Sequence, residues 1–274
     1  MNAQLDAYRT SDGYKVFVHR YTPSDTPRGR VVYLHGIQSH AGWYEQSCRA
    51  LTQAGFGVEF LERRGSGRNT QARGDTPSWR RLVEDIVELL DQGPPAVLLS
   101  VSWGCKLAVA LEQCYPGRTQ GLGLITPGIC TQLRPPLVTR LRIGGAWWFA
   151  PSRTERVGAD DPALFTSNPQ RQAFIRDDPL SLRRATARFF IESVRLDAAI
   201  AQARLRVPVL LMLAGQDRIT DNERTKQYVS RLQAPEVQVI EYPQASHTLE
   251  FEPDPTAVFR DLVTWVEKQC VQPA

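Results

Sequence analysis

The chain has 274 residues, 42% of them hydrophobic and 23% charged, with a formal net charge of +4 at pH 7. These values are ordinary for a globular protein with a sizeable core, and they exclude a disordered, collagen-like or coiled-coil protein. No apolar run approaches the roughly 20 residues of a membrane-spanning helix, the N-terminus does not resemble a secretory signal, and the five scattered cysteines favour reduced thiols in a cytoplasm.

Strands and helices are predicted to alternate through the first half of the chain. Runs of β-branched, aromatic or apolar residues predict strands at 14–19, 31–34, 58–61, 96–100 and 122–126. Helical character is expected between them, at 43–54, 79–90 and 106–114. The helix that begins at Trp79 has the clearest periodicity, because its apolar residues recur at the spacing of one helix face.

The alternation breaks at about residue 129 and returns at about residue 207. We interpret residues 129–206 as a helical cap inserted into a core of residues 1–128 and 207–274. After the break, strands are predicted at 207–213 and 237–241, and helices at 222–232 and from 255. This order predicts an α/β fold with a mostly parallel central sheet and helices on both faces.

The predicted cap is rich in arginine and in aromatic residues. It holds 13 arginines and no lysine, against 7 acidic residues. This positive surplus is either a solvated arginine-rich face or a surface that attracts anionic substrates or an anionic lipid surface. Trp147 and Trp148 are candidates to line an acyl channel or to contact lipid, and equally to form the cap's own core. Elsewhere basic and acidic residues are interspersed, so we expect no nucleic-acid partner.

A degenerate nucleophile elbow follows the strand at 96–100. The segment Ser100-Val101-Ser102-Trp103-Gly104 stands directly before a helix, which is the context that Gly-x-Ser-x-Gly requires. The serine of an elbow adopts a strained backbone conformation, so small residues are needed two positions before and after it. Gly104 fits this pattern, whereas Ser100 stands where glycine is usual, so the motif alone is a weak signal.

Two later strand ends strengthen this interpretation. Asp217 follows the strand at 207–213, and His247 follows the strand at 237–241. In the α/β-hydrolases the catalytic residues occur in the chain order serine, aspartate, histidine, each just after a strand, and this chain has the same order. We therefore predict Ser102 as nucleophile, His247 as base and Asp217 as the acid that orients it. The alternative is a surface-turn histidine and a turn or helix-cap aspartate.

These motifs resemble the α/β-hydrolases of the monoglyceride lipase and lysophospholipase-like group, which is of the serine aminopeptidase S33 type. The resemblance runs from about residue 13 to 266. It is carried by Leu34-His35-Gly36, Ala54-Gly55-Phe56, Arg63-Arg64-Gly65-Ser66-Gly67-Arg68, Asp178-Pro179, Pro208-Val209-Leu210, Gly215-Gln216-Asp217 and Ser246-His247.

The resemblance implies an α/β-hydrolase fold whose cap follows the sixth strand and faces lipid. It also implies serine esterase chemistry on a small-molecule acyl ester, with no cofactor and no metal. Carried over by position, the backbone N–H groups of Ile37 and Trp103 would form the oxyanion hole. His35 is expected to brace the loop that holds Ile37. No feature of the sequence indicates an oligomeric state.

Departures from the group's pattern concern the substrate. The loop after His-Gly in monoglyceride lipases carries a Glu and an Arg that organise the pocket for the glycerol head group. Those positions are Ser39 and Trp43 here, and the residue before the nucleophile, often histidine, is Val101. A site that hydrogen-bonds a polyol loses affinity when its partners are replaced, so a different carboxylic ester is at least as good a candidate as monoacylglycerol.

Three functions stay open at this point. The leading one is hydrolysis of a carboxylic ester through an acyl-enzyme on Ser102. A second keeps the triad in a thioesterase, an amidase or peptidase, or an acyltransferase, and the cap arginines would suit an anionic CoA thioester. The third is a catalytically silent hydrolase fold that binds a ligand. Dehalogenase and epoxide hydrolase chemistry is disfavoured, because those relatives carry aspartate in place of Ser102.

Overall fold

A single eight-stranded sheet crosses the middle of the computed structural model, which describes residues 3–158 and 160–270. Its strands are β1 (Gln4–Arg9), β2 (Lys15–Tyr21), β3 (Arg30–Leu34), β4 (Gly57–Leu61), β5 (Ala96–Val101), β6 (Thr119–Ile125), β9 (Val209–Ala214) and β10 (Val237–Tyr242). They lie side by side in the order β1-β2-β4-β3-β5-β6-β9-β10.

The sheet is parallel from β4 to β10 and antiparallel at β1 and β2. The predicted mostly parallel α/β architecture is therefore confirmed. One strand of this sheet was not predicted: β1 has no buried residue, and its side chains are exposed or half-buried at the edge of the sheet. A polar edge strand gives little hydrophobic periodicity to detect.

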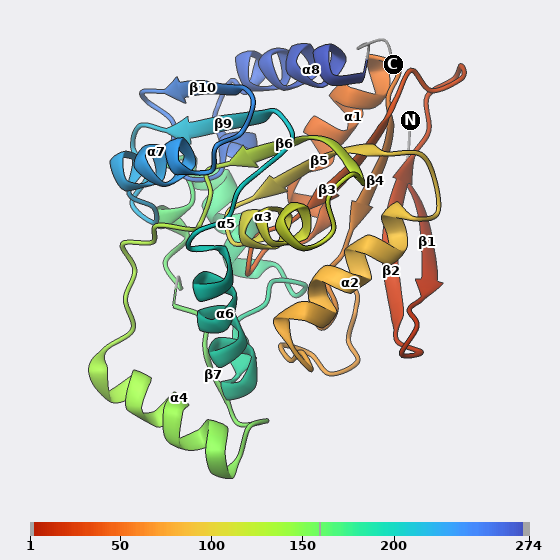
Figure 1. Ribbon diagram of the computed structural model, residues 1–274. Coiled ribbons are helices and arrows are strands. Elements are labelled where there is room, and N and C mark those ends of the chain that lie inside the picture. Colours follow the sequence, from red (N-terminus) through yellow and green to blue (C-terminus); the bar gives the residue numbers. More distant parts are fainter. Residues whose placement is uncertain (1–2, 159, 271–274) are drawn as a thin grey trace.

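Helices cover both faces of the sheet (Figure 1). They are α1 (Glu45–Gln53), α2 (Trp79–Leu90), α3 (Gly104–Cys114), α7 (Asn222–Arg231) and α8 (Thr256–Cys270). Strand residues alternate between two cores: Val31 and Tyr33 pack on the side of α1 and α8, whereas Val32 and Leu34 pack on the side of α2 and α3. Successive strand side chains point to opposite faces, so a strand covered on both sides is apolar throughout.

Between β6 and β9 the chain leaves the sheet. This insertion contains α4 (Leu137–Phe149), β7 (Thr154–Arg156), η2 (Pro162–Leu164), α5 (Pro169–Asp177), β8 (Arg184–Thr186) and α6 (Ala187–Ile200). Helix α6 packs on α3, and α4 packs on α6 at the opposite end of the molecule from α8 (Figure 1). The predicted helical insertion after the sixth strand is thus present, together with a short β7–β8 ladder that was not predicted.

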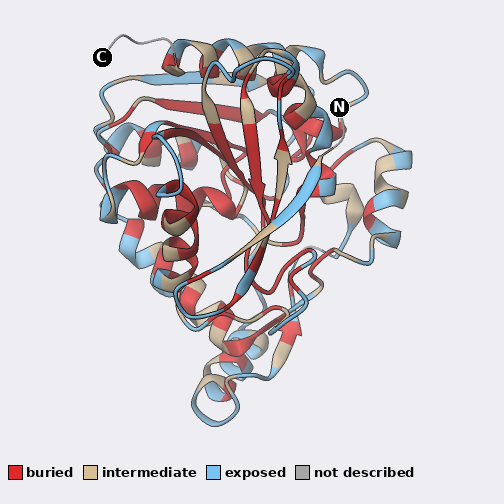
Figure 2. Ribbon diagram, turned by 90° about the vertical axis from the view of Figure 1, so that its right-hand side faces the viewer, coloured by how far each residue is buried: buried red, intermediate tan, exposed pale blue. Residues whose placement is uncertain are grey.

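The inner strands of the sheet are largely buried, whereas the edge strands β1 and β10 and the insertion carry many exposed residues (Figure 2). Within the described residues, no helix combines the length and the apolarity needed to cross a membrane. The division of the chain into a core of residues 1–128 and 207–274 and a separate cap of residues 129–206 stays a prediction.

Candidate active site

Ser102 occupies the sharp turn between β5 and α3. Its φ of 51° lies in the left-handed region that non-glycine residues rarely adopt. The turn is fixed by hydrogen bonds from Ser102 N–H to the Ile125 carbonyl (3.0 Å) and from Gly128 N–H to the Ser102 carbonyl (2.9 Å). A Cβ at Gly104 would lie 2.5 Å from the His35 carbonyl oxygen, so the position two residues after the serine accepts glycine alone.

Ser100 fits the other small position of the elbow without distorting it. Its side chain is fully buried, and its hydroxyl donates to the Gly123 carbonyl on the neighbouring strand at 2.9 Å. The extra hydroxyl therefore has a hydrogen-bond acceptor inside the sheet, which removes the penalty of burying it. The unusual serine is compatible with the strained turn because β6 supplies this partner.

The structure brings the three predicted triad residues together. His247 Nε2 lies 3.0 Å from Ser102 Oγ, and His247 Nδ1 lies 2.7 Å from Asp217 Oδ2. The side chains of His247 and Asp217 are 2% and 1% exposed, whereas Ser102 is partly open to solvent. The ring of Phe165, from the insertion, meets the His247 ring edge-on at 6.0 Å between centroids, and Thr248 N–H donates to the Phe165 carbonyl at 2.8 Å.

Asp217 is held as a carboxylate by its surroundings. Burial disfavours its charged form, but the charge and hydrogen bond of His247, with bonds from Thr220 Oγ1 (2.6 Å) and Ile219 N–H (2.7 Å), outweigh burial and keep its pKa below its usual value. An ionised Asp217 accepts the Nδ1 proton of His247. That tautomer, assigned from the hydrogen bonds, leaves Nε2 free to accept the proton of Ser102.

Two backbone N–H groups beside Ser102 are free for a substrate oxygen. In the described part of the chain, the N–H groups of Ile37 and Trp103 donate to no protein atom. The loop of Ile37 runs next to the nucleophile, since a Cβ at Gly36 would lie 3.2 Å from Ser102 Cβ. The arrangement suits an oxyanion hole, and that role stays a prediction.

Gly128 is a residue of this region that the sequence analysis missed as part of the site. A Cβ at this position would lie 3.0 Å from the Trp103 nitrogen and 3.3 Å from Ser102 Oγ. Glycine therefore keeps the space in front of the nucleophile and of the Trp103 N–H open. The only signal in the sequence was a Pro-Gly pair after a strand, which also marks ordinary turns.

The loop before Ile37 is braced by a buried histidine. His35 Nδ1 lies 2.7 Å from the Gly36 carbonyl, and Arg63 N–H donates to His35 Nε2 at 2.9 Å. Burial, with the nearby charge of Arg63, lowers the pKa of His35 to about 3, so the ring is neutral and donates through Nδ1. These bonds agree with the predicted bracing role of His35.

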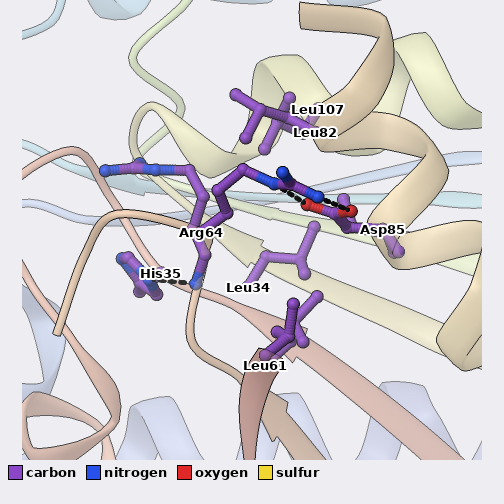
Figure 3. A pocket seen from close by; sticks show the side chains of 10 residues that line it. Leu34, His35, Leu61, Arg64, Leu82, Asp85 and Leu107 are labelled. Atoms are coloured by element: carbon purple, nitrogen blue, oxygen red, sulfur yellow. Dashed lines mark hydrogen bonds and ion pairs between the residues drawn. The ribbon is translucent and has the colours of Figure 1, made fainter. Parts of the chain in front are cut away.

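A small internal pocket lies beneath the same histidine (Figure 3). Leu34, Leu61 and Leu107 surround it, and Arg64 donates two hydrogen bonds of 2.8 Å to the two carboxylate oxygens of Asp85. None of the triad residues lines this pocket. The Arg64–Asp85 ion pair therefore lies at the edge of the pocket. Because no triad residue lines it, we do not assign this pocket to the substrate. Among the described residues, no group of three or more His, Cys, Asp or Glu side chains is placed to hold a metal ion.

The three pocket candidates near the nucleophile are all buried. Ser39 Oγ accepts from Gly36 N–H and from the Tyr44 hydroxyl, each at 3.0 Å. Trp43 packs in the core and donates through Nε1 to Asp178 Oδ2 at 2.8 Å. Val101 packs in the core on the side of α1 and α8. Their contacts are with protein groups, and a role in lining the substrate pocket stays a prediction.

The two tryptophans of α4 differ in their surroundings. Trp147 is half-buried with the Arg195 guanidinium 4.9 Å from its ring centroid, whereas Trp148 is 74% exposed. On α4, only Ile143 and Ala146 are buried. The exposed apolar residues of α4 are Leu137, Val138, Leu141, Trp148 and Phe149, which we call the α4 apolar face. Trp148 thus belongs to a surface and not to the core of the insertion.

Comparisons with known proteins agree with this fold. The family described as serine aminopeptidase, S33, matches residues 25–254. A monoacylglycerol lipase of Mycolicibacterium smegmatis is 28% identical over 269 residues, which cover 93% of each chain. Phospholipase YtpA of Bacillus subtilis is 24% identical over 245 residues, covering 86% of this chain and 94% of that protein. The solved structure of a soluble variant of Saccharomyces cerevisiae monoglyceride lipase in complex with a substrate analogue has a TM-score of 0.85 at 19% identity, covering 99% of this chain and 97% of that chain.

Proposed function

The chain belongs to the serine aminopeptidase S33 family and has the α/β-hydrolase fold, and from this premise we propose that it is a serine hydrolase that cleaves carboxylic esters through an acyl-enzyme on Ser102. The observation that carries the proposal is the continuous hydrogen-bonded relay from Asp217 through His247 to Ser102, on a backbone turn with positive φ. Relatives named as a monoacylglycerol lipase and a phospholipase support an ester as the substrate.

In the proposed mechanism, Ser102 Oγ attacks the ester carbonyl carbon while its proton moves to His247 Nε2. Asp217 stabilises the imidazolium that forms. The carbonyl oxygen becomes negative and accepts hydrogen bonds from Ile37 and Trp103, each donor lowering the barrier by about 3 kcal/mol. Collapse of the tetrahedral intermediate expels the alcohol, which takes the proton from His247. Water, deprotonated by His247, then attacks the acyl-enzyme carbonyl, and collapse of this second tetrahedral intermediate returns the proton from His247 to Ser102 Oγ and releases the carboxylic acid.

The substrate we propose is an ester recognised through its acyl chain and not through a glycerol head group. The hydroxyl of Ser39 and the indole N–H of Trp43 are both engaged with protein groups, at the positions where the resemblance expects a Glu and an Arg, respectively, for the polyol. A site without those partners gains little from a polyol over another alcohol.

Transient contact with an anionic lipid surface is the second part of the proposal. The α4 apolar face is exposed, and the insertion around it carries the arginine surplus of the chain. An apolar face in a positively charged setting is what peripheral contact with anionic lipid requires. Such contact would bring the insertion to the source of a lipid ester.

The experiment that tests the catalytic proposal is labelling with a fluorophosphonate, read by intact mass. Wild type is expected to gain one adduct, because the relay activates Ser102, and Ser102→Ala is expected to gain none. The matched control is Ser100→Gly, which keeps the nucleophile, restores the usual elbow residue and is expected to label fully. Absence of an adduct on wild type would overturn the proposal and favour the ligand-binding alternative.

A panel of acyl p-nitrophenyl esters, the corresponding CoA thioesters and anilides then separates the reaction classes that share the triad. We expect kcat/KM to be highest for oxygen esters and to change with acyl length. A thioester preference would overturn the carboxylic-ester assignment while leaving the triad assignment in place.

A further inference from the structure

Arg63 is a buried cation without a counter-ion. Only 6% of the residue is exposed, and no carboxylate of the described residues forms an ion pair with it. Its neighbour Arg64 shows the contrast, since Arg64 is paired with Asp85 (Figure 3) and also with Asp12. Burying an unpaired charge destabilises the folded state, so a buried and unpaired Arg63 suggests that this residue has a function.

The guanidinium of Arg63 touches both residues of the proposed oxyanion hole. Nη1 donates to the Gly36 carbonyl at 3.3 Å, and Nη2 donates to the Ile37 carbonyl at 3.0 Å. Its central carbon lies 4.8 Å from the ring centroid of Trp103 and 5.2 Å from that of Phe189. The cation therefore lies against two aromatic rings that also contact each other, and directly behind the loop that carries Ile37.

The bond to Gly36 acts on the peptide unit that presents the Ile37 N–H. The Gly36 carbonyl and the Ile37 N–H are the two ends of one peptide group. That carbonyl accepts from His35 Nδ1 (2.7 Å) as well as from Arg63. Donors on a carbonyl draw electron density toward its oxygen, which makes the N–H at the other end a stronger donor. The second bond, to the Ile37 carbonyl, fixes the orientation of that residue.

The charge on Arg63 persists at neutral pH. Burial, and then the neighbouring charge of Arg73, lower the pKa of Arg63 from its usual value, but a guanidinium stays protonated there. A fixed positive charge beside the hole interacts most with a substrate oxygen once that oxygen becomes negative, which happens only on the way to the tetrahedral intermediate.

We propose that Arg63 is a positioning residue of the oxyanion hole, a role that rests on the proposed function. It holds the Gly36–Ile37 peptide in place, and its charge strengthens the Ile37 N–H as a donor to the oxyanion, without contact to the substrate. The residue acts on the transition state and leaves substrate binding unchanged.

The test compares the hydrolysis of p-nitrophenyl butyrate by Arg63→Met, Arg63→Lys and wild type. The concentration of active sites in each preparation is taken from complete labelling with fluorophosphonate, and kcat is calculated per labelled serine. We expect Arg63→Met to lower kcat by about 10- to 100-fold with KM within about twofold, because a transition-state interaction is lost. Arg63→Lys, which keeps the charge, is expected to recover part of that loss. The matched control is Arg73→Met, since Arg73 also donates to backbone carbonyls, those of Gly67, Leu180 and Ser181, and should keep kcat within about threefold.

A second measurement separates positioning from general destabilisation. A trifluoromethyl ketone forms a tetrahedral adduct on the serine with its oxyanion in the hole, so its Ki should rise across the variants by the factor by which kcat/KM falls. Unchanged kcat per site and unchanged Ki in Arg63→Met would overturn the role of Arg63 in an active enzyme. If Arg63→Met does not fold, Arg63→Gln, neutral but still a donor, carries the same two readouts. Absence of hydrolysis and labelling in wild type would instead overturn the proposed function.

Discussion

The carboxyl group of Glu250 joins the loop that carries His247 to the first turn of α1. It accepts hydrogen bonds from Gln46 N–H (2.7 Å) and Ser47 N–H (3.0 Å), which have no partner within the helix. Burial raises its pKa from 4.5 to about 7. The group is thus half-protonated near neutral pH, three residues from the candidate base.

This shift predicts a pH dependence of stability. Between pH 4.5 and 7 the folded chain holds a proton on Glu250 that the unfolded chain has lost, so the stabilisation is complete below pH 4.5 and is lost as the pH rises through 7. Glu250→Gln keeps an accepting oxygen and has no proton to lose. The free energy of unfolding of wild type should therefore fall by about 3 kcal/mol relative to this variant between pH 4.5 and pH 8. Urea unfolding at four pH values checks this, and a difference that does not vary with pH would contradict it.

At the scale of single residues, sequence reasoning selected three residues that the structure brings into contact, although their catalytic roles stay a prediction. Ser102, Asp217 and His247 each follow a strand end, and in a parallel sheet those ends meet at one edge. Arg63 and Gly128 were not identified as site residues, because their roles depend on which atoms lie opposite them in the folded chain. Trp43 was identified as a departure from the family pattern and Asp178 as part of a family motif, but the hydrogen bond between them spans 135 positions and could not be predicted from the sequence.

At the scale of elements, the carboxylate of Asp178 fastens the insertion to the core. It stands directly after α5, and its Oδ2 accepts from His40 Nε2 (2.9 Å), Trp43 Nε1 (2.8 Å) and Ser181 Oγ (2.8 Å). His40 and Trp43 belong to the turn around η1 (Ala41–Trp43), which precedes α1. Burial opposes the charge of Asp178, but the bonds and charge of these partners hold its pKa well below the usual range.

Loss of this charge should loosen the insertion. Asp178→Asn is expected to lower the free energy of unfolding by about 2 kcal/mol, since hydrogen bonds to an ionised group are worth more than those to an amide. Urea unfolding at pH 7 measures the change. The matched control is Asp177→Asn, the exposed neighbour, whose effect should stay within about 0.5 kcal/mol. Equal effects of the two variants would show that Asp178 does not fasten the insertion.

Helices and strands could be predicted where burial produces a recognisable pattern of apolar residues in the sequence. Strands β3, β5 and β9 are almost entirely apolar because both faces of the sheet are covered there, and α2 shows an apolar stripe because its other face is more open to solvent. The ladder β7–β8 was missed because three-residue strands are too short to show alternation. Strand β1 was missed because none of its residues is buried, so no apolar face marks it in the sequence.

At the scale of the whole molecule, exposed apolar side chains gather at one end. Figure 1 places α4 at the bottom of the molecule and α8 at the top, and α4 carries five of the ten exposed large apolar residues of the described chain. Phe149 is 92% exposed. The proposed lipid contact would therefore orient the molecule with the insertion toward the lipid.

Replacing the most exposed aromatic residues should weaken that contact. The double variant Trp148→Ser and Phe149→Ser is expected to bind phosphatidylglycerol vesicles at least about 10-fold more weakly, because two aromatic side chains no longer leave water. Co-sedimentation measures the binding. The control Val194→Ser removes an exposed apolar residue of α6 and should bind as wild type does. Equal binding of the double variant and wild type would rule out the α4 apolar face as the contact.

The contact between Phe165 and His247 has a consequence for how the insertion is able to move. Because Phe165 packs on the imidazole and its carbonyl accepts from Thr248 N–H, any displacement of the insertion near Phe165 also displaces the candidate base. Helix α4, in contrast, buries only Ile143 and Ala146. The insertion is therefore tied to the rest of the molecule unevenly: its middle contacts the triad through Phe165, whereas α4 packs on α6 and buries little of its own surface. An acyl chain that enters or leaves past α4 would find the triad still assembled.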